Sequence, residues 1–165
     1  AFLYTTGPYP LSYNGWGDVL VIIFFGFVPV GGTYYVQALT WTPDVTIASI
    51  ICGLLIDTLL VVNNYRDREA DARSGKRTVI VRFGEKFGRY FYLLLGISAS
   101  LLCLYFLREG HIYAALLPQL YLVPHVLTWR RMVKIHSGKK LNSILGETSR
   151  NMLFMGILLA IGMIL

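Results

Sequence analysis

The stretch that decides the fold is VTIASIICGLLIDTLLVVNNYRDREAD, residues 45–71. Its first 18 residues, up to Val62, are almost wholly apolar and long enough to cross the hydrocarbon core of a bilayer as a helix. Amides, acids and arginines begin at Asn63, directly after this apolar run. The stretch therefore predicts a membrane-spanning helix that carries a polar cluster at one end.

Comparable apolar blocks lie on both sides of this stretch, in a chain of 165 residues that is 55% hydrophobic. We expect five spans, at about residues 18–39, 45–62, 90–107, 112–129 and 152–165. Residues 1–165 are thus predicted to form a single all-α domain, a polytopic transmembrane helical bundle. Because the last block is short and the first residue is not methionine, we expect a fragment of a longer protein.

The positions of lysine and arginine predict how the chain is oriented in the membrane. Fourteen of the fifteen lie in two segments, eight in residues 66–89 and six in residues 130–150. Since cytoplasmic loops collect positive charge, both segments are expected on the cytoplasmic side, together with residues 1–16. The net charge of +6 then reflects orientation and attraction to anionic lipid. Nucleic-acid binding is not indicated, because no groove-reading module is evident.

Two carboxylates follow the apolar run, one helical turn apart. Asn63, Asp67 and Asp71 are spaced at i, i+4 and i+8, so a continuing helix stacks them on one face. Such hard oxygen ligands suit Mg²⁺, which is usually held by one or two carboxylates, waters and substrate phosphates. The neighbouring amides and cations are candidates for binding a diphosphate: Asn63, Asn64, Arg66, Lys76 and Arg77. The residues alone leave open that the acids form only surface ion pairs with nearby arginines.

A further carboxyl, Asp57, lies ten residues before Asp67 and so about 15 Å deeper along the helix axis. A carboxyl embedded in a membrane costs roughly 2.5–3.5 kcal/mol on insertion scales, so Asp57 is expected to face the bundle interior or a wet cavity. The sequence is compatible with a neutral, hydrogen-bonded group and equally with a group that touches substrate.

Several stretches resemble one known family. Residues 61–67 (VVNNYRD), Asp71 and residues 75–84 (GKRTVIVRFG) closely resemble the second aspartate-rich motif and following loop of the UbiA-superfamily intramembrane prenyltransferases. Within that superfamily they look most like the 1,4-dihydroxy-2-naphthoate prenyltransferases of menaquinone synthesis, and residues 9–18, 24–26 and 32–37 support this branch. The resemblance implies nine transmembrane helices, of which the five here would be the last. It also implies a bacterial inner-membrane protein whose motif loop is cytoplasmic.

By that resemblance, the intact protein transfers a polyprenyl group from polyprenyl diphosphate to dihydroxynaphthoate, with loss of the ring carboxylate, and gives demethylmenaquinone. Asp67 and Asp71 would be the catalytic acids that bind Mg²⁺, together with acids of a first aspartate-rich motif. The diphosphate would contact Asn63, Asn64, Arg66, Lys76 and Arg77. Residues 1–165 do not contain the first motif, so the chain by itself is expected to be inactive.

Three other functions share some of these sequence features. A UbiA-type enzyme with a different aromatic acceptor would carry the same motif. A CDP-alcohol phosphotransferase requires a glycine beside an aspartate and a second GxxxDxxxD, whereas Asp71 is followed by Ala72 and Arg73. A cation-coupled transporter would use Asp57 for its coupling ion and would show inverted repeats, which are not evident here.

We predict that the coding sequence upstream of Ala1 contains a second helix end of the NxxxDxxxD type. Such a motif would supply the remaining metal ligands of a prenyltransferase site. Reading the upstream gene sequence tests this directly, and its absence would contradict the prenyltransferase interpretation.

Overall fold

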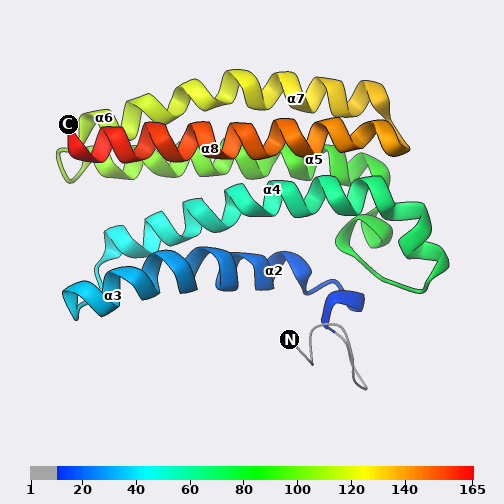
Figure 1. The fold of residues 1–165 in the computed structure, drawn as a ribbon, viewed down its shortest axis with the longest axis horizontal. Helices are drawn as coiled ribbons and strands as arrows, with labels where there is room; N and C mark the ends of the chain where they lie inside the picture. The colour runs from blue at the N-terminus through cyan, green and yellow to red at the C-terminus, as the bar shows by residue number, and fades with distance from the viewer. Residues whose placement is uncertain (1–10) are drawn as a thin grey trace.

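The structure is a computed structural model that describes residues 11–165, so the predicted motif residues Tyr9 and Pro10 lie outside it. Over the described range the chain forms only helices and short connections, without a strand. The helices pack side by side as antiparallel rods (Figure 1). The predicted all-α helical bundle is therefore confirmed.

Five rods make up the bundle. The first joins α2 (Gly17–Val21), η2 (Ile22–Gly31) and α3 (Gly32–Ala38), and the second is α4 (Pro43–Arg73). The third joins α5 (Val79–Leu102) and η3 (Cys103–Leu107), and the fourth joins α6 (Ile112–Leu116), η4 (Leu117–Tyr121) and α7 (Leu122–Ile135). The last is α8 (Asn142–Ile164), preceded by the 3₁₀ turn η5 (Lys139–Leu141); a similar turn, η1 (Leu11–Tyr13), opens the described chain.

Within residues 11–165, four helical segments are long and apolar enough to cross a membrane. They are Gly17–Ala38, Pro43–Arg73, Val79–Leu107 and Lys139–Ile164. The predicted span at residues 112–129 corresponds to the fourth rod, in which a 3₁₀ segment begins next to Pro118. Proline has no backbone N–H, so the regular α-helical hydrogen bonding is interrupted at this point.

Pro29 has a similar effect in the first rod. Residues Ile22–Gly31 form a π-helix, and Pro29 lies inside it. Proline has no N–H to donate to the backbone hydrogen bonds of this helix. Nearby, the thiol of Cys52 donates to the carbonyl of Phe25 at 3.5 Å, so a side chain of α4 contacts the backbone of the first rod.

The first rod and α4 approach each other backbone to backbone. A Cβ atom on Gly26 would lie 3.0 Å from Gly53 Cα, and one on Gly53 would lie 2.9 Å from Ile22 Cα. Contacts this short leave no room for a side chain, so the two glycines set the distance between the helices. This is the small-residue packing that brings membrane helices together.

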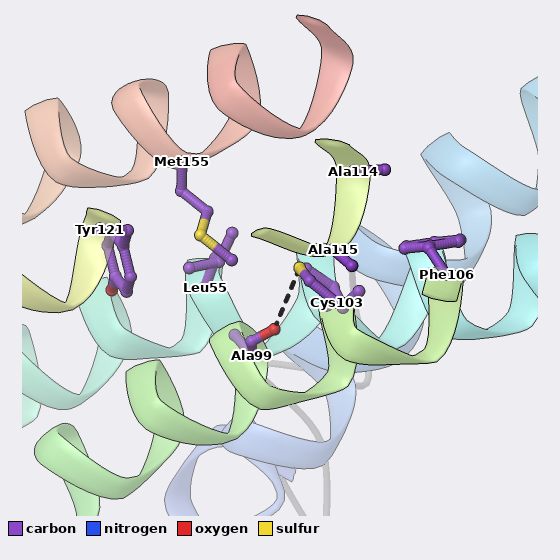
Figure 2. Packing of buried hydrophobic residues seen from close by; sticks show 9 residues of the cluster. Leu55, Ala99, Cys103, Phe106, Ala114, Ala115, Tyr121 and Met155 are labelled. Carbon is purple, nitrogen blue, oxygen red and sulfur yellow. Dashed lines mark hydrogen bonds between the residues drawn. The ribbon is translucent and has the colours of Figure 1, made fainter. Parts of the chain in front are cut away.

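The centre of the bundle is filled by buried apolar side chains of α4, α5, η3, α6 and α8. Figure 2 shows Met155 of α8 pointing toward Leu55 of α4, beside Cys103 and Ala99. The Cys103 thiol donates to the Ala99 carbonyl at 3.4 Å, so it is a packed side chain within its own helix. A second cluster, which includes Tyr65, joins α4 to α5, α7 and α8 nearer the acidic end of α4.

Both basic segments lie at the same end of the bundle. Arg66 Nη1 donates to Asn142 Oδ1 at 2.9 Å, and His136 Nε2 lies 3.1 Å from Glu85 Oε1. These contacts join the end of α4, the start of α5, the end of α7 and the start of α8 (Figure 1). The polar cluster of the central helix is thus part of one polar face.

We predict that Gly96→Ala destabilises the bundle although alanine favours helix. The new methyl group would overlap the ring of His125, which is buried and stacked between Tyr92 and Tyr121. Overpacking of this kind costs about 1–3 kcal/mol. Thermal unfolding of the purified full-length protein measures the effect.

Gly156→Ala is the matched control, because a Cβ atom added at Gly156 would meet no heavy atom of a neighbouring element within 4 Å. It should unfold at the wild-type temperature or slightly above. Equal destabilisation by both alanines would contradict the packing described for Gly96.

Candidate functional site

The acidic end of α4 remains helical through Asp67 and Asp71 as far as Arg73. Arg66 is at the centre of its first polar cluster. Its guanidinium donates to both Asp67 oxygens, at 2.7 and 2.6 Å, and to Asn63 Oδ1 at 2.8 Å. A third contact reaches Asn142 at the start of α8. Arg66 therefore orients an acid and two amides from two helices.

Asp71 belongs to a second cluster, one turn further along. Lys76 Nζ lies 3.4 Å from each Asp71 oxygen, and the Asp71 side chain is only 14% exposed. The loop between them is held by its backbone, since Lys76 N donates to Asp71 O at 2.9 Å and Gly75 adopts a φ of +76°. The left-handed conformation favours glycine at that position. The loop thus folds the lysine back onto the acid.

Although its sequence neighbour Lys76 contacts a motif acid, the side chain of Arg77 lies exposed at the surface. The backbone N–H of Arg77 donates to Tyr13 O at 2.8 Å. The loop is therefore tied to the segment before α2, and Thr78 then caps α5 by accepting from Val81 N at 3.2 Å. The Arg77 guanidinium is free to move at the surface of this end.

A small cavity of about 30 Å³ lies behind Lys76. Its polar lining comes from α4 and from the segments around it: Asp18, Asn64, Lys76 and Thr78. Asn64 is buried and points toward the first rod, whereas its neighbour Asn63 contacts Arg66. The two adjacent amides of the sequence motif thus belong to different surroundings.

Arg68 is turned away from both acids. It lies 4.5 Å above the Tyr65 ring and pairs with Glu85 at 3.1 Å. Glu85 also pairs with Arg89, whose Nε donates to the Tyr65 hydroxyl at 2.9 Å. This arrangement joins α4 to α5 beneath the motif. Of the arginines near the acids in sequence, Arg66 is the one that contacts an acid of the motif.

The structure therefore separates the predicted site residues into two groups. Asn63, Arg66 and Asp67 lie together, as do Asn64, Asp71 and Lys76, while Arg77 contributes its backbone. Sequence reasoning missed Asn142, for which no local signal exists, because its contact depends on how α8 docks. The roles of these residues in metal and diphosphate binding stay predictions.

The donor chemistry of this end fits a magnesium ion that completes its shell with water and phosphate. Among residues 11–165 no three His, Cys, Asp or Glu side chains cluster tightly enough to hold a metal by themselves. The two carboxylates Asp67 and Asp71 nevertheless lie on successive turns of one helix, with amide oxygens beside them. Magnesium sites commonly need only one or two carboxylates when a phosphate supplies the other ligands.

An apolar groove runs along α4 away from this end. Two hollows of about 780 and 610 Å³ form it, and both are lined by Val30, Ala48 and Leu159. Its walls come from η2, α3, α4 and α8, and its lining is mainly hydrophobic. The groove can accommodate a long apolar chain in the half of the bundle away from the polar end.

Comparisons with known proteins agree on one family. The profile of the UbiA prenyltransferase family matches residues 1–164. A 1,4-dihydroxy-2-naphthoate octaprenyltransferase of Haemophilus influenzae is 43% identical over 103 residues, which are 62% of this chain and 33% of that protein. No solved structure matches the chain significantly.

Two other relatives extend the comparison. UbiA prenyltransferase domain-containing protein 1 of Dictyostelium discoideum is 30% identical over 162 residues, 98% of this chain and 48% of that protein. A 2-carboxy-1,4-naphthoquinone phytyltransferase of Synechocystis is 28% identical over 101 residues, 61% of this chain and 33% of that protein. The matched segments thus cover between a third and a half of these relatives.

We predict that Arg66→Lys destabilises the acidic end of α4. A lysine ammonium cannot donate in two parallel bonds to Asp67 and also reach Asn63 and Asn142. The loss should be about 1 kcal/mol, because the Arg66 side chain is largely but not fully buried. The thermal unfolding midpoint of the full-length protein measures it.

Arg73→Lys serves as the control, since Arg73 is exposed in the last turn of the same helix. Its unfolding midpoint should equal that of the wild type. If the two variants unfolded at the same temperature, the Arg66 contacts would contribute nothing to stability.

Proposed function

Because the chain belongs to the UbiA prenyltransferase family, we propose that it forms the second aspartate-rich half of an intramembrane prenyltransferase site. The donor would be a polyprenyl diphosphate and the acceptor 1,4-dihydroxy-2-naphthoate. The chain covers at most half of the relatives compared above, so the complete site would include residues outside it. By itself the chain would be inactive.

The observation that carries this proposal is the pairing of each motif acid with one cation. Asp67 is held by Arg66 and Asp71 by Lys76. A magnesium diphosphate carries both positive and negative charge. When it binds, the acids would contact the metal instead of the cations, and the cations would contact the phosphates instead of the acids. Charge-assisted contacts of this kind are stronger than neutral hydrogen bonds. Each acid and each cation would therefore keep a partner of opposite charge.

The apolar groove supports a long prenyl tail. The diphosphate would lie at the polar end of α4, and the tail would follow the groove past Cys52 and Ala48 toward Met163. Burial of a hydrocarbon chain contributes about 25 cal/mol for each Å² of apolar surface removed from water. The groove thus favours a donor with an extended hydrocarbon tail over a short one.

The chemistry assigned to this chain is to bind and stabilise the leaving diphosphate. A divalent metal bound at the acids would add Lewis-acid stabilisation of that group. Arg66 and Lys76 would neutralise further charge as the bond between carbon and diphosphate oxygen breaks and the prenyl carbon bonds to the ring. The ring then loses its carboxylate as carbon dioxide. Apolar surroundings would keep water from the cationic carbon.

The acceptor follows from the relatives. The names of the Haemophilus and Synechocystis proteins share a naphthalene-type acceptor but differ in the prenyl group. We infer a dihydroxynaphthoate acceptor and leave the tail length open within the polyprenyl class. Another aromatic acceptor is the alternative, and a panel of acceptors offered to the full-length protein distinguishes the two.

The orientation is part of the same proposal. Both basic segments lie at one end of the bundle with the motif, and cytoplasmic ends collect such charge. We therefore place the diphosphate site at the cytoplasmic surface of a bacterial inner membrane, where a water-soluble acceptor and magnesium are available.

We predict that Asp67→Asn and Asp71→Asn each lower Mg²⁺-dependent prenylation by at least about 100-fold. Even indirect partners of metal ligands commonly cost 10–100-fold when removed. Formation of the prenylated product is measured with the full-length protein in membranes, across a magnesium titration.

Glu69→Gln is the matched control, because Glu69 is an exposed acid between the two on the same helix end. It should keep wild-type activity and wild-type magnesium dependence. Undiminished activity in both aspartate variants would refute the assignment of Asp67 and Asp71.

A further inference from the structure

Asp57 is a buried acid without a hydrogen-bonding partner. It lies in the middle of α4 with 1% of its surface exposed. Neither of its carboxyl oxygens has a hydrogen-bond partner among the described residues. Since an unpaired charge inside a membrane bundle is costly, some group must compensate for this carboxyl.

A second acid, Asp18 of α2, interacts electrostatically with Asp57 and is also buried. The packing of the first rod on α4 explains their proximity. The helices run antiparallel and touch where Gly53 meets Ile22. Asp18 lies one turn before Ile22, and Asp57 lies one turn after Gly53. The two carboxyls therefore occupy the next layer of the same interface.

No cation of the described chain pairs with either carboxyl. Neither acid takes part in the ion pairs found within residues 11–165. Two ionised carboxylates in a low-dielectric interface repel one another, and Lys76, which lines a small cavity beside Asp18, is paired with Asp71. Two carboxyl groups so placed are stable when they hold one proton between them, as neighbouring carboxyls in other proteins do.

A small polar cavity is lined both by Asp18 and by residues of the motif end. The cavity of about 30 Å³ is lined by Asp18, Asn64, Thr78 and Lys76. A site of this size with several polar partners can hold one water molecule. Because Lys76 also contacts Asp71, a chain of polar groups extends from the motif to Asp18.

We propose that Asp18 and Asp57 form a buried proton-binding site, in which the two carboxyls share one proton across the interface of α2 and α4. Sharing requires the two side chains to rotate toward one another, since neither Asp57 oxygen has a hydrogen-bond partner among the residues that the structure describes. The pair carries one negative charge and can accept a second proton to become neutral. This site is separate from Asp67 and Asp71 and does not depend on the proposed prenyl transfer.

Infrared spectroscopy of the full-length protein in lipid nanodiscs at neutral pH tests the proposal. Aspartate is labelled with ¹³C, so that the C=O stretch of a protonated aspartic acid shifts and can be assigned. We expect a label-sensitive band from the pair in the wild type. Both Asp18→Asn and Asp57→Asn should remove it, because the remaining acid then ionises against a neutral amide that donates to it.

Asp44→Asn is the control, since Asp44 lies at the other end of α4, and its spectrum should keep the band. Loss of the band in Asp57→Asn alone would show an isolated protonated acid and overturn the sharing. Absence of any band that depends on either residue would overturn the site. These results are independent of catalysis, so they can fail while the prenyltransferase assignment holds.

Thermal unfolding verifies that both asparagine variants are folded. If one is not, Asp18→Glu or Asp57→Glu replaces it, because a glutamate keeps the carboxyl but escapes the aspartate label. If the proton is shared, each glutamate variant should give a weaker ¹³C-labelled band. Part of the C=O signal then comes from the unlabelled glutamic acid and absorbs at the frequency of the unlabelled group. An unchanged labelled band in either one would overturn the proposal.

Discussion

The energetic cost of placing charge in a hydrocarbon environment governs the organisation of this chain. Nearly all of its cations lie in two segments, and the structure brings both to the same end of the bundle. There each acid of the motif can be held by a cation from its own helix or loop. The same cost applies to Asp18 and Asp57, which lie deeper in the bundle and are buried beside the contact between the first rod and α4 rather than exposed to the lipid.

Because unpaired charge is costly at the membrane, each acid of the motif is paired with a cation. Arg66 and Lys76 hold Asp67 and Asp71 in place, so the acids are neutralised before any ligand arrives. In the proposed site, a diphosphate with its metal would replace these partners charge for charge. Arg68, in contrast, stacks on Tyr65 and pairs with Glu85, which fixes α4 on α5. The basic residues near the motif therefore have two roles. Arg66 and Lys76 can contact a ligand, whereas Arg68 holds α4 against α5.

Much of the fold could be predicted from local patterns. Apolar blocks of span length predicted the helices. Stacking of Asp67 and Asp71 on one face required the helix to continue past the apolar run, and α4 does continue to Arg73. What could not be predicted depends on tertiary contact. The contact of Asn142 with Arg66 requires α8 to dock on α4, and the hydrogen bond from Cys52 to Phe25 depends on the π-helical turn at Pro29. Neither has a periodic signal in the sequence.

The contact between Arg66 and Asn142 has a consequence for how the protein is made. Its two residues are 76 positions apart, and at about 5–20 residues per second the ribosome needs roughly 4–15 s to synthesise that interval. During this time α4 is already complete while α8 has yet to be made. The arginine that orients Asp67 therefore lacks one of its partners until α8 is inserted. Maturation of the acidic end is coupled to completion of α8, so a nascent chain that stalls before α8 carries an unfinished site.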